Sequence, residues 1–135
     1  MKQPKISGKN REMIIKTAKK YGLNFLVLFG SQVSGETHKK SDADIAYSAK
    51  KPLSYQKEYN LTRELQKILG FSGEIEIVDL SKASPLLAKE VAFKGRLLSE
   101  SIPHSFAYFQ MYAFKMFVEA APLLNLRNNF INRNL

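Results

Sequence analysis

The sequence contains no cysteine, and its only histidines are His38 and His104. Without cysteine the chain can form no disulfide, no thiolate zinc site and no cysteine nucleophile. Residues 1–12 are polar and basic with no apolar run behind them, so they indicate neither a signal peptide nor a transit sequence. We therefore expect a cytoplasmic protein.

Acidic residues are scarce, with 12 Asp and Glu against 21 Lys and Arg, which gives a formal net charge of +9. A basic surface attracts phosphates, nucleic acid or an acidic protein partner. Several of the basic residues could instead merely solvate the outer face of one helix: Lys9, Arg11, Lys16, Lys19 and Lys20. Charge alone therefore leaves the partner open.

The chain has 135 residues, of which 44% are hydrophobic. This length supports one domain with a core and is too short for two ordinary domains. We expect the main domain over residues 1–100, followed by a C-terminal helix and tail over residues 101–135.

The spacing of apolar residues predicts alternating helices and strands. Helices are expected over residues 11–21, 55–69 and 85–94, strands over residues 25–29, 42–47 and 74–80, and one more helix begins near Ser31. Ser54 is a plausible N-cap for the second of these helices. The order predicts an α/β (α+β) fold, in which a small mixed sheet is covered by helices.

The texture of the chain changes after Pro103. Residues 106–118 are rich in aromatic residues and methionine, and the only charges nearby are Lys115 and Glu119. This predicts a helix that is apolar nearly all round and shorter than the ~20 residues that span a bilayer. It must pack against its own domain or a partner. Residues 125–135 are rich in asparagine and are expected to fray.

Gly30 and Ser31 directly follow the buried strand over residues 25–29. A glycine there lets the backbone approach a phosphate, and a serine near the start of a helix adds a hydroxyl and an N–H group. The pair predicts a site for a phosphate group.

Asp42 and Asp44 are two residues apart on a predicted strand, so both carboxylates leave the same face while Ala43 and Ile45 point into the core. Mg²⁺ takes carboxylate oxygens together with substrate phosphates, and a two-metal site holds its ions ~3.5–4 Å apart. The pair predicts a magnesium site with two ions.

A third carboxylate is expected from the strand over residues 74–80. Glu74 and Glu76 share one face by strand parity, whereas Asp79 lies on the other face with Ile77. We choose Glu76. A base at this position, beside two metal ions, can take the proton from an acceptor hydroxyl that attacks the α-phosphorus.

Glycine-serine at residues 30–31, ten further residues, and then Asp-Ala-Asp at residues 42–44 form one spaced motif. It resembles the signature of the minimal nucleotidyltransferases of the DNA polymerase beta-like superfamily. The resemblance covers about residues 11–98. The tail is similar to that of longer members that are paired with a helical HEPN-type toxin.

The resemblance implies that Gly30 and Ser31 grip the triphosphate of ATP, that Asp42 and Asp44 bind Mg²⁺, and that a third carboxylate completes the site. It further implies an antitoxin that transfers AMP from ATP to a hydroxyl, with a tyrosine of the cognate toxin as acceptor. One position departs from the pattern. The family usually has aspartate where this chain offers Glu76, whose oxygens lie about one bond further out.

Two other functions stay open. A non-catalytic antitoxin would neutralise its partner by binding alone, which the change to Glu76 favours and the intact pair Asp42 and Asp44 opposes. A nucleic-acid-binding module would explain the net charge, but the chain has no helix-turn-helix, zinc or aromatic reader motif.

Overall fold

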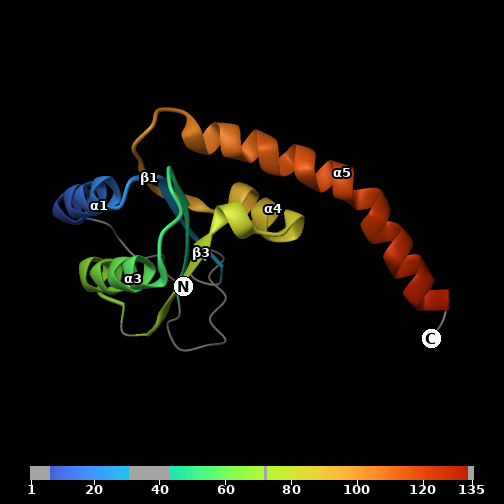
Figure 1. The fold of residues 1–135 in the computed structure, drawn as a ribbon, viewed down its shortest axis with the longest axis horizontal. Helices are drawn as coiled ribbons and strands as arrows, with labels where there is room; N and C mark the ends of the chain where they lie inside the picture. Colours follow the sequence, from blue (N-terminus) through green and yellow to red (C-terminus); the bar gives the residue numbers. More distant parts are fainter. Residues whose placement is uncertain (1–6, 31–42, 72, 134–135) are drawn as a thin grey trace.

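The computed structural model describes residues 7–30, 43–71 and 73–133. Its elements in chain order are α1 (Gly8–Lys20), β1 (Leu23–Phe29), β2 (Ala43–Ala49), α3 (Tyr55–Leu69), β3 (Ile75–Asp79), the 3-10 turn η1 (Leu80–Lys82), α4 (Pro85–Lys94), β4 (Arg96–Glu100) and α5 (Ser105–Arg133). The helix expected near Ser31 lies outside the described residues. Figure 1 shows a body of sheet and helices, beyond which the second half of α5 projects.

The four strands form one sheet in the order β3-β2-β1-β4. β1 pairs antiparallel with β2 and β4, and β2 pairs parallel with β3. β1 is therefore a central strand, and every side chain from Phe25 to Phe29 is buried. Burial on both faces explains why this strand reads as an unbroken apolar run.

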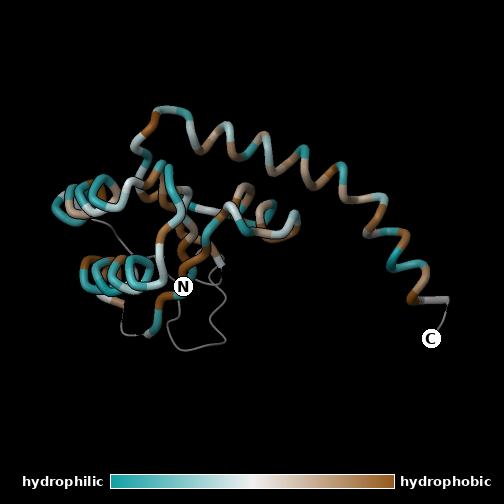
Figure 2. Tube along the Cα trace, in the orientation of Figure 1, coloured by the Kyte–Doolittle hydropathy of each residue, from teal (hydrophilic) through white to brown (hydrophobic). Residues whose placement is uncertain are grey.

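Helices cover both faces of the sheet. On one face, α1 and α3 contribute Ile14, Ala18, Leu61, Leu65 and Ile68, which pack against Leu26, Leu28, Ile45, Tyr47 and Ile75 of the strands. On the other face, Val91 of α4 and Phe106 of α5 pack against Phe25, Val27, Phe29 and Ala46. One hydrophobic cluster thus lies on each face of the sheet, and along β2 Ile45 and Tyr47 enter the first while Ala46 enters the second. Figure 2 shows hydrophobic residues concentrated in the strands.

The predicted fold class is confirmed, because a mixed sheet lies between helices. The predicted bounds of α3 and α4 also match the structure. Each helix begins after a serine whose Oγ accepts a backbone N–H three residues on, from Lys57 to Ser54 and from Leu87 to Ser84, both at 3.2 Å. The cap at Ser54 confirms the N-cap expected from the sequence, and Ser84 caps α4 in the same way.

The strand β4 was not expected. It is a short edge strand with the sequence RLLSE, and it forms through its pairing with β1 rather than through a pattern of its own. The expected division of the chain at residue 100 falls at the end of this strand and stays a prediction.

The prediction that residues 125–135 fray is wrong for residues 125–133, because α5 is 29 residues long and ends at Arg133. The helix is also longer than residues 106–118, over which the sequence predicted it. Among the described residues, no helix combines the length and the apolar character that a membrane crossing needs.

The side chain of Tyr47 connects β2 to α3. It is fully buried, and its hydroxyl donates a hydrogen bond to Oε2 of Glu58. Burial, followed by this hydrogen bond, raises the pKa of the Tyr47 hydroxyl well above its ordinary value, so the hydroxyl stays neutral. β2, which carries Asp44, is therefore held to α3 by a specific polar contact as well as by packing.

We expect Tyr47→Phe to lower the free energy of unfolding by about 1–3 kcal/mol, because Glu58 would lose its donor in a half-buried place. Urea unfolding measures the effect. The matched control is Tyr55→Phe, since Tyr55 is 89% exposed; it should change stability by less than about 0.5 kcal/mol. Equal effects of the two substitutions would contradict a role for the Tyr47–Glu58 contact.

Candidate active site

The end of β1 brings Gly30 against the side chain of Asp44. Gly30 has a φ of +85°, in the region that favours glycine. A Cβ on Gly30 would overlap Oδ2 of Asp44 and would lie 3.0 Å from its Cγ. The cause is the antiparallel register of β1 and β2, in which Phe29 pairs with Asp44. Glycine is thus required here both for its backbone conformation and for the space above it.

Asp44 and Glu76 are partners across the parallel strands β2 and β3. Ala46 and Val78, two residues further along each strand, both pack into the cluster under α4 and α5. By strand parity Asp44 and Glu76 leave that same face of the sheet. The structure therefore brings together three of the predicted site residues, Gly30, Asp44 and Glu76. Asp44 is half-buried and Glu76 is exposed.

Asp79 is turned to the opposite face. Its Oδ1 accepts hydrogen bonds from the backbone N–H of Ser81 at 2.9 Å and from the Ser81 hydroxyl at 2.7 Å. Its carboxylate is therefore engaged in the turn η1. Of the two acidic residues in β3, Glu76 shares the register and the face of Asp44, and Asp79 lies on the other face, the separation that strand parity predicted.

Ser31 and Asp42 lie outside the described residues, and their predicted roles stay predictions. Within residues 7–30, 43–71 and 73–133, no three acidic or histidine side chains converge on one point. Asp44 and Glu76 supply two sets of carboxylate oxygens, the donors that Mg²⁺ prefers. The donor chemistry fits a magnesium ion.

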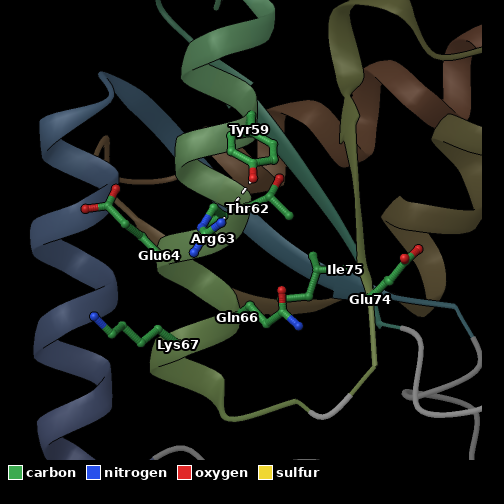
Figure 3. Close-up of a pocket in the computed structure, with 8 residues that line it drawn as sticks. All are labelled: Tyr59, Thr62, Arg63, Glu64, Gln66, Lys67, Glu74 and Ile75. Carbon is green, nitrogen blue, oxygen red and sulfur yellow. Dashed lines mark hydrogen bonds between the residues drawn. The ribbon is translucent and has the colours of Figure 1, made fainter.

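A separate open groove of about 820 Å³ lies along α3 and the start of β3. Figure 3 shows Arg63 donating a hydrogen bond to the Tyr59 hydroxyl, 3.0 Å away, while Glu74 points away from the α3 side chains. Ile75, which also lines the groove, packs into the cluster under α1 and α3. The groove is therefore on the opposite face of the sheet from Asp44 and Glu76, and it is not the predicted nucleotide site.

A model of the family described as polymerase beta, nucleotidyltransferase matches residues 12–103. The chain belongs to this nucleotidyltransferase family. The match begins in α1 and ends just before α5, so it includes all the strands of the sheet and with them Gly30, Asp44 and Glu76. The resemblance seen in the sequence motif is confirmed.

Two curated relatives are protein adenylyltransferases named MntA. The chain is 34% identical over 76 residues to the one from Shewanella oneidensis, and this match covers 56% of the chain and 53% of the relative. It is 33% identical over 101 residues to the one from Aphanizomenon flos-aquae, which covers 65% of this chain and 64% of the relative. The chain thus matches about half to two thirds of the length of these relatives.

Solved structures share the fold. A toxin–antitoxin structure with AMP-PNP superposes with a TM-score of 0.71 at 26% identity, and the match covers 90% of this chain and 98% of that one. A tri-AMPylated HEPN toxin from Shewanella oneidensis in complex with its MNT antitoxin gives a TM-score of 0.67 at 25% identity, and covers 91% and 97%. The nucleotidyltransferase fold expected from the sequence is confirmed by these neighbours.

We expect Gly30→Ala to destabilise the protein more than Gly22→Ala. Both glycines have positive φ, which costs a residue with a Cβ roughly 1–2 kcal/mol. Only at Gly30 does the added Cβ meet another group, the Asp44 carboxylate, whereas nothing lies within 4 Å at Gly22. The crowding should add about 1–3 kcal/mol to the loss, measured by urea unfolding.

A cycle with Asp44→Ala tests the cause. Removing the carboxylate should recover part of the stability that Gly30→Ala loses, because the two changes act on one contact. Equal losses for the two glycine substitutions would show that Asp44 does not occupy the space above Gly30.

Proposed function

We propose that this chain transfers AMP from ATP to the hydroxyl of a tyrosine on a cognate HEPN-type toxin, and so acts as an antitoxin. The observation that carries the proposal is the seating of the Asp44 carboxylate against Gly30 and beside Glu76. A glycine that leaves room for a carboxylate, next to a second carboxylate on the same face, suits a site where phosphates and cations meet.

In the proposed reaction the tyrosine oxygen attacks the α-phosphorus of ATP. A new phosphorus–oxygen bond forms, the bond from the α-phosphorus to the bridging oxygen breaks, and pyrophosphate leaves. The tyrosine proton passes to Glu76, whose side chain is exposed. Gly30 and Ser31 hold the triphosphate through backbone N–H groups and the serine hydroxyl.

Asp42, Asp44 and Glu76 would hold Mg²⁺, in two ions, since carboxylates are the protein ligands that this ion takes beside substrate phosphates. Bound Mg²⁺ supplies positive charge to the triphosphate and to the leaving pyrophosphate. Asp44 is fixed for this work by the pairing of β2 with β1 and β3 and by the Tyr47–Glu58 contact.

The choice of acceptor rests on the relatives. The curated ones are named protein adenylyltransferases, and a similar solved complex holds a tri-AMPylated HEPN toxin with its antitoxin. A further similar structure contains AMP-PNP, an analogue of ATP. These names support ATP as the substrate and a toxin as the protein acceptor.

A non-catalytic antitoxin is the second candidate, and Glu76 is the observation that favours it. Glutamate reaches further than the aspartate usual at this position, so its oxygens need not meet those of Asp44 at a shared ion. In this case the chain would bind its partner without modifying it.

The test mixes purified chain, Mg²⁺, labelled ATP and the proposed cognate HEPN-type toxin, and follows label into the partner. We expect Glu76→Gln to reduce the rate by about 10²–10⁴-fold, because the base is lost. Changing both Asp42 and Asp44 to Asn should abolish transfer. The matched control is Glu74→Gln. Glu74 is exposed and directly precedes β3, and the transfer rate of this variant should stay within about twofold of the wild-type rate.

The outcomes separate the two candidates. Label on the partner that disappears with the aspartate changes supports the transferase. A stable complex that never acquires label would leave binding as the antitoxin's mode of action. Label transfer by the Glu76→Asp variant would then show that the longer side chain of Glu76 prevents the reaction. Transfer that persists in the double aspartate variant would rule out the proposed site.

A further inference from the structure

The helix α5 is apolar on two sides, and only one of them is covered. On the inner side, the rings of Phe106 and Phe109 lie 5.3 and 5.6 Å from the ring of Phe25 in β1. Ala113 is fully buried against α4, and the Gln110 side chain donates to the backbone oxygen of Ala92 at 2.8 Å. These contacts fix the first half of α5 on the body.

The outer side carries a second row of large apolar side chains. Tyr108, Met111, Tyr112, Leu123 and Leu126 are 60–71% exposed. At 100° per residue, Tyr108, Tyr112, Leu123 and Leu126 fall within about 60° of one another around the helix. These five residues, here called the outer stripe, span about 27 Å along α5, with Met111 about 60° to one side. The exposed Lys115–Glu119 ion pair lies on the same face between Tyr112 and Leu123, so the stripe has two apolar parts.

The outer stripe continues onto a part of α5 that leaves the body. Pro122 stands inside the helix, where proline removes a backbone N–H and favours a bend. Figure 1 shows α5 bending in its second half and extending well past α4. Residues 122–133, here called the arm, therefore present Leu123 and Leu126 at a distance from the core.

We propose that the outer stripe is the docking surface for the protein that accepts AMP, and that this partner covers it with an apolar helix face bordered by acidic residues. This inference rests on the proposed function, whose partner it describes. Apolar residues at helical spacing over several turns suit packing against another helix. Two exposed apolar patches on one helix face, on either side of an ion pair, mark an interaction site with a polar contact at its centre.

Charge decides against a second copy of the chain as the occupant. Each copy carries a formal net charge of +9, so two copies repel each other. The helix itself has Lys115, Arg127 and Arg133 against a single acidic residue, Glu119, which already pairs with Lys115 at 3.8 Å. An acidic partner complements this surface.

A lipid surface fits less well than a protein. Helices that lie on membranes carry many Lys and Arg residues on their polar side. The arm has only Arg127 and Arg133 and is otherwise rich in asparagine. A protein helix, which can pair with amides as well as with apolar groups, suits this composition better.

The test combines Leu123→Lys with Leu126→Lys and measures, by titration calorimetry, binding of the proposed cognate HEPN-type toxin. Leucine and lysine have similar helix propensities, and both positions are exposed, so the fold should be kept. Both leucines would be buried in the complex with the partner, so replacing them should weaken binding by about a hundredfold or more. Binding of Mg²⁺–ATP by the variant should equal that of the wild type.

The matched control is Asn128→Lys, which adds the same charge in the same stretch but about 140–160° around the helix from the two leucines. It should leave partner binding within about threefold of wild type. Equal binding by the double leucine variant would overturn the docking surface, and so would a wild-type chain that does not bind this protein.

Two further results would assign the outer stripe to another occupant and overturn the proposal. The first is a dimer of the chain alone, and the second is binding to anionic vesicles. In either case the double leucine variant would lose the interaction and the Asn128→Lys control would keep it. The docking surface and the proposed reaction fail separately. If the wild type binds the partner through the stripe but transfers no AMP, the reaction fails and the docking surface stands.

Discussion

The contact on which the rest of this structure depends is the one between Gly30 and the Asp44 carboxylate. β1 is buried on both faces and has to leave the sheet at its end, and its antiparallel register with β2 sets Asp44 opposite Phe29. The carboxylate then occupies the space that a Cβ on Gly30 would need. Because β2 also pairs in parallel with β3, the same register places Glu76 beside Asp44. The missing side chain at Gly30 thus leaves room for the Asp44 carboxylate, beside which Glu76 of the next strand lies.

Much of this arrangement could be predicted from the sequence because its signals are local. The serines before α3 and α4 accept backbone N–H groups three residues on, and both helices begin where predicted. Parity along β3 separated Glu76 from Asp79, and the structure engages Asp79 in hydrogen bonds to Ser81 on the other face. A side chain's face depends only on its position within its own strand, so no knowledge of the partner strand was needed.

The parts that could not be predicted depend on contacts between distant residues. β4 is five residues long and becomes a strand because β1 offers an edge for it. The pairing of Asp44 with Glu76 requires β2 and β3 to be parallel and in one register, which no local pattern specifies. The continuation of α5 through an asparagine-rich segment also exceeds what propensity suggests. The partner that Glu58 provides for Tyr47 comes from another element and has no sequence signature.

The exposure of Glu76 bears on why the proposed reaction would use a surface such as the outer stripe. Among the described residues of the site, Glu76 is exposed and Asp44 is half-buried, and two carboxylates can hold cations and phosphates but cannot by themselves choose among protein hydroxyls. A selective reaction then has to derive its selectivity from contacts elsewhere, which raise the local concentration of one hydroxyl at the site. α5 meets that requirement in part by its construction. Its inner side is anchored to the sheet through Phe106 and Phe109, so that a partner held along its outer side would also be held at a fixed distance from Asp44.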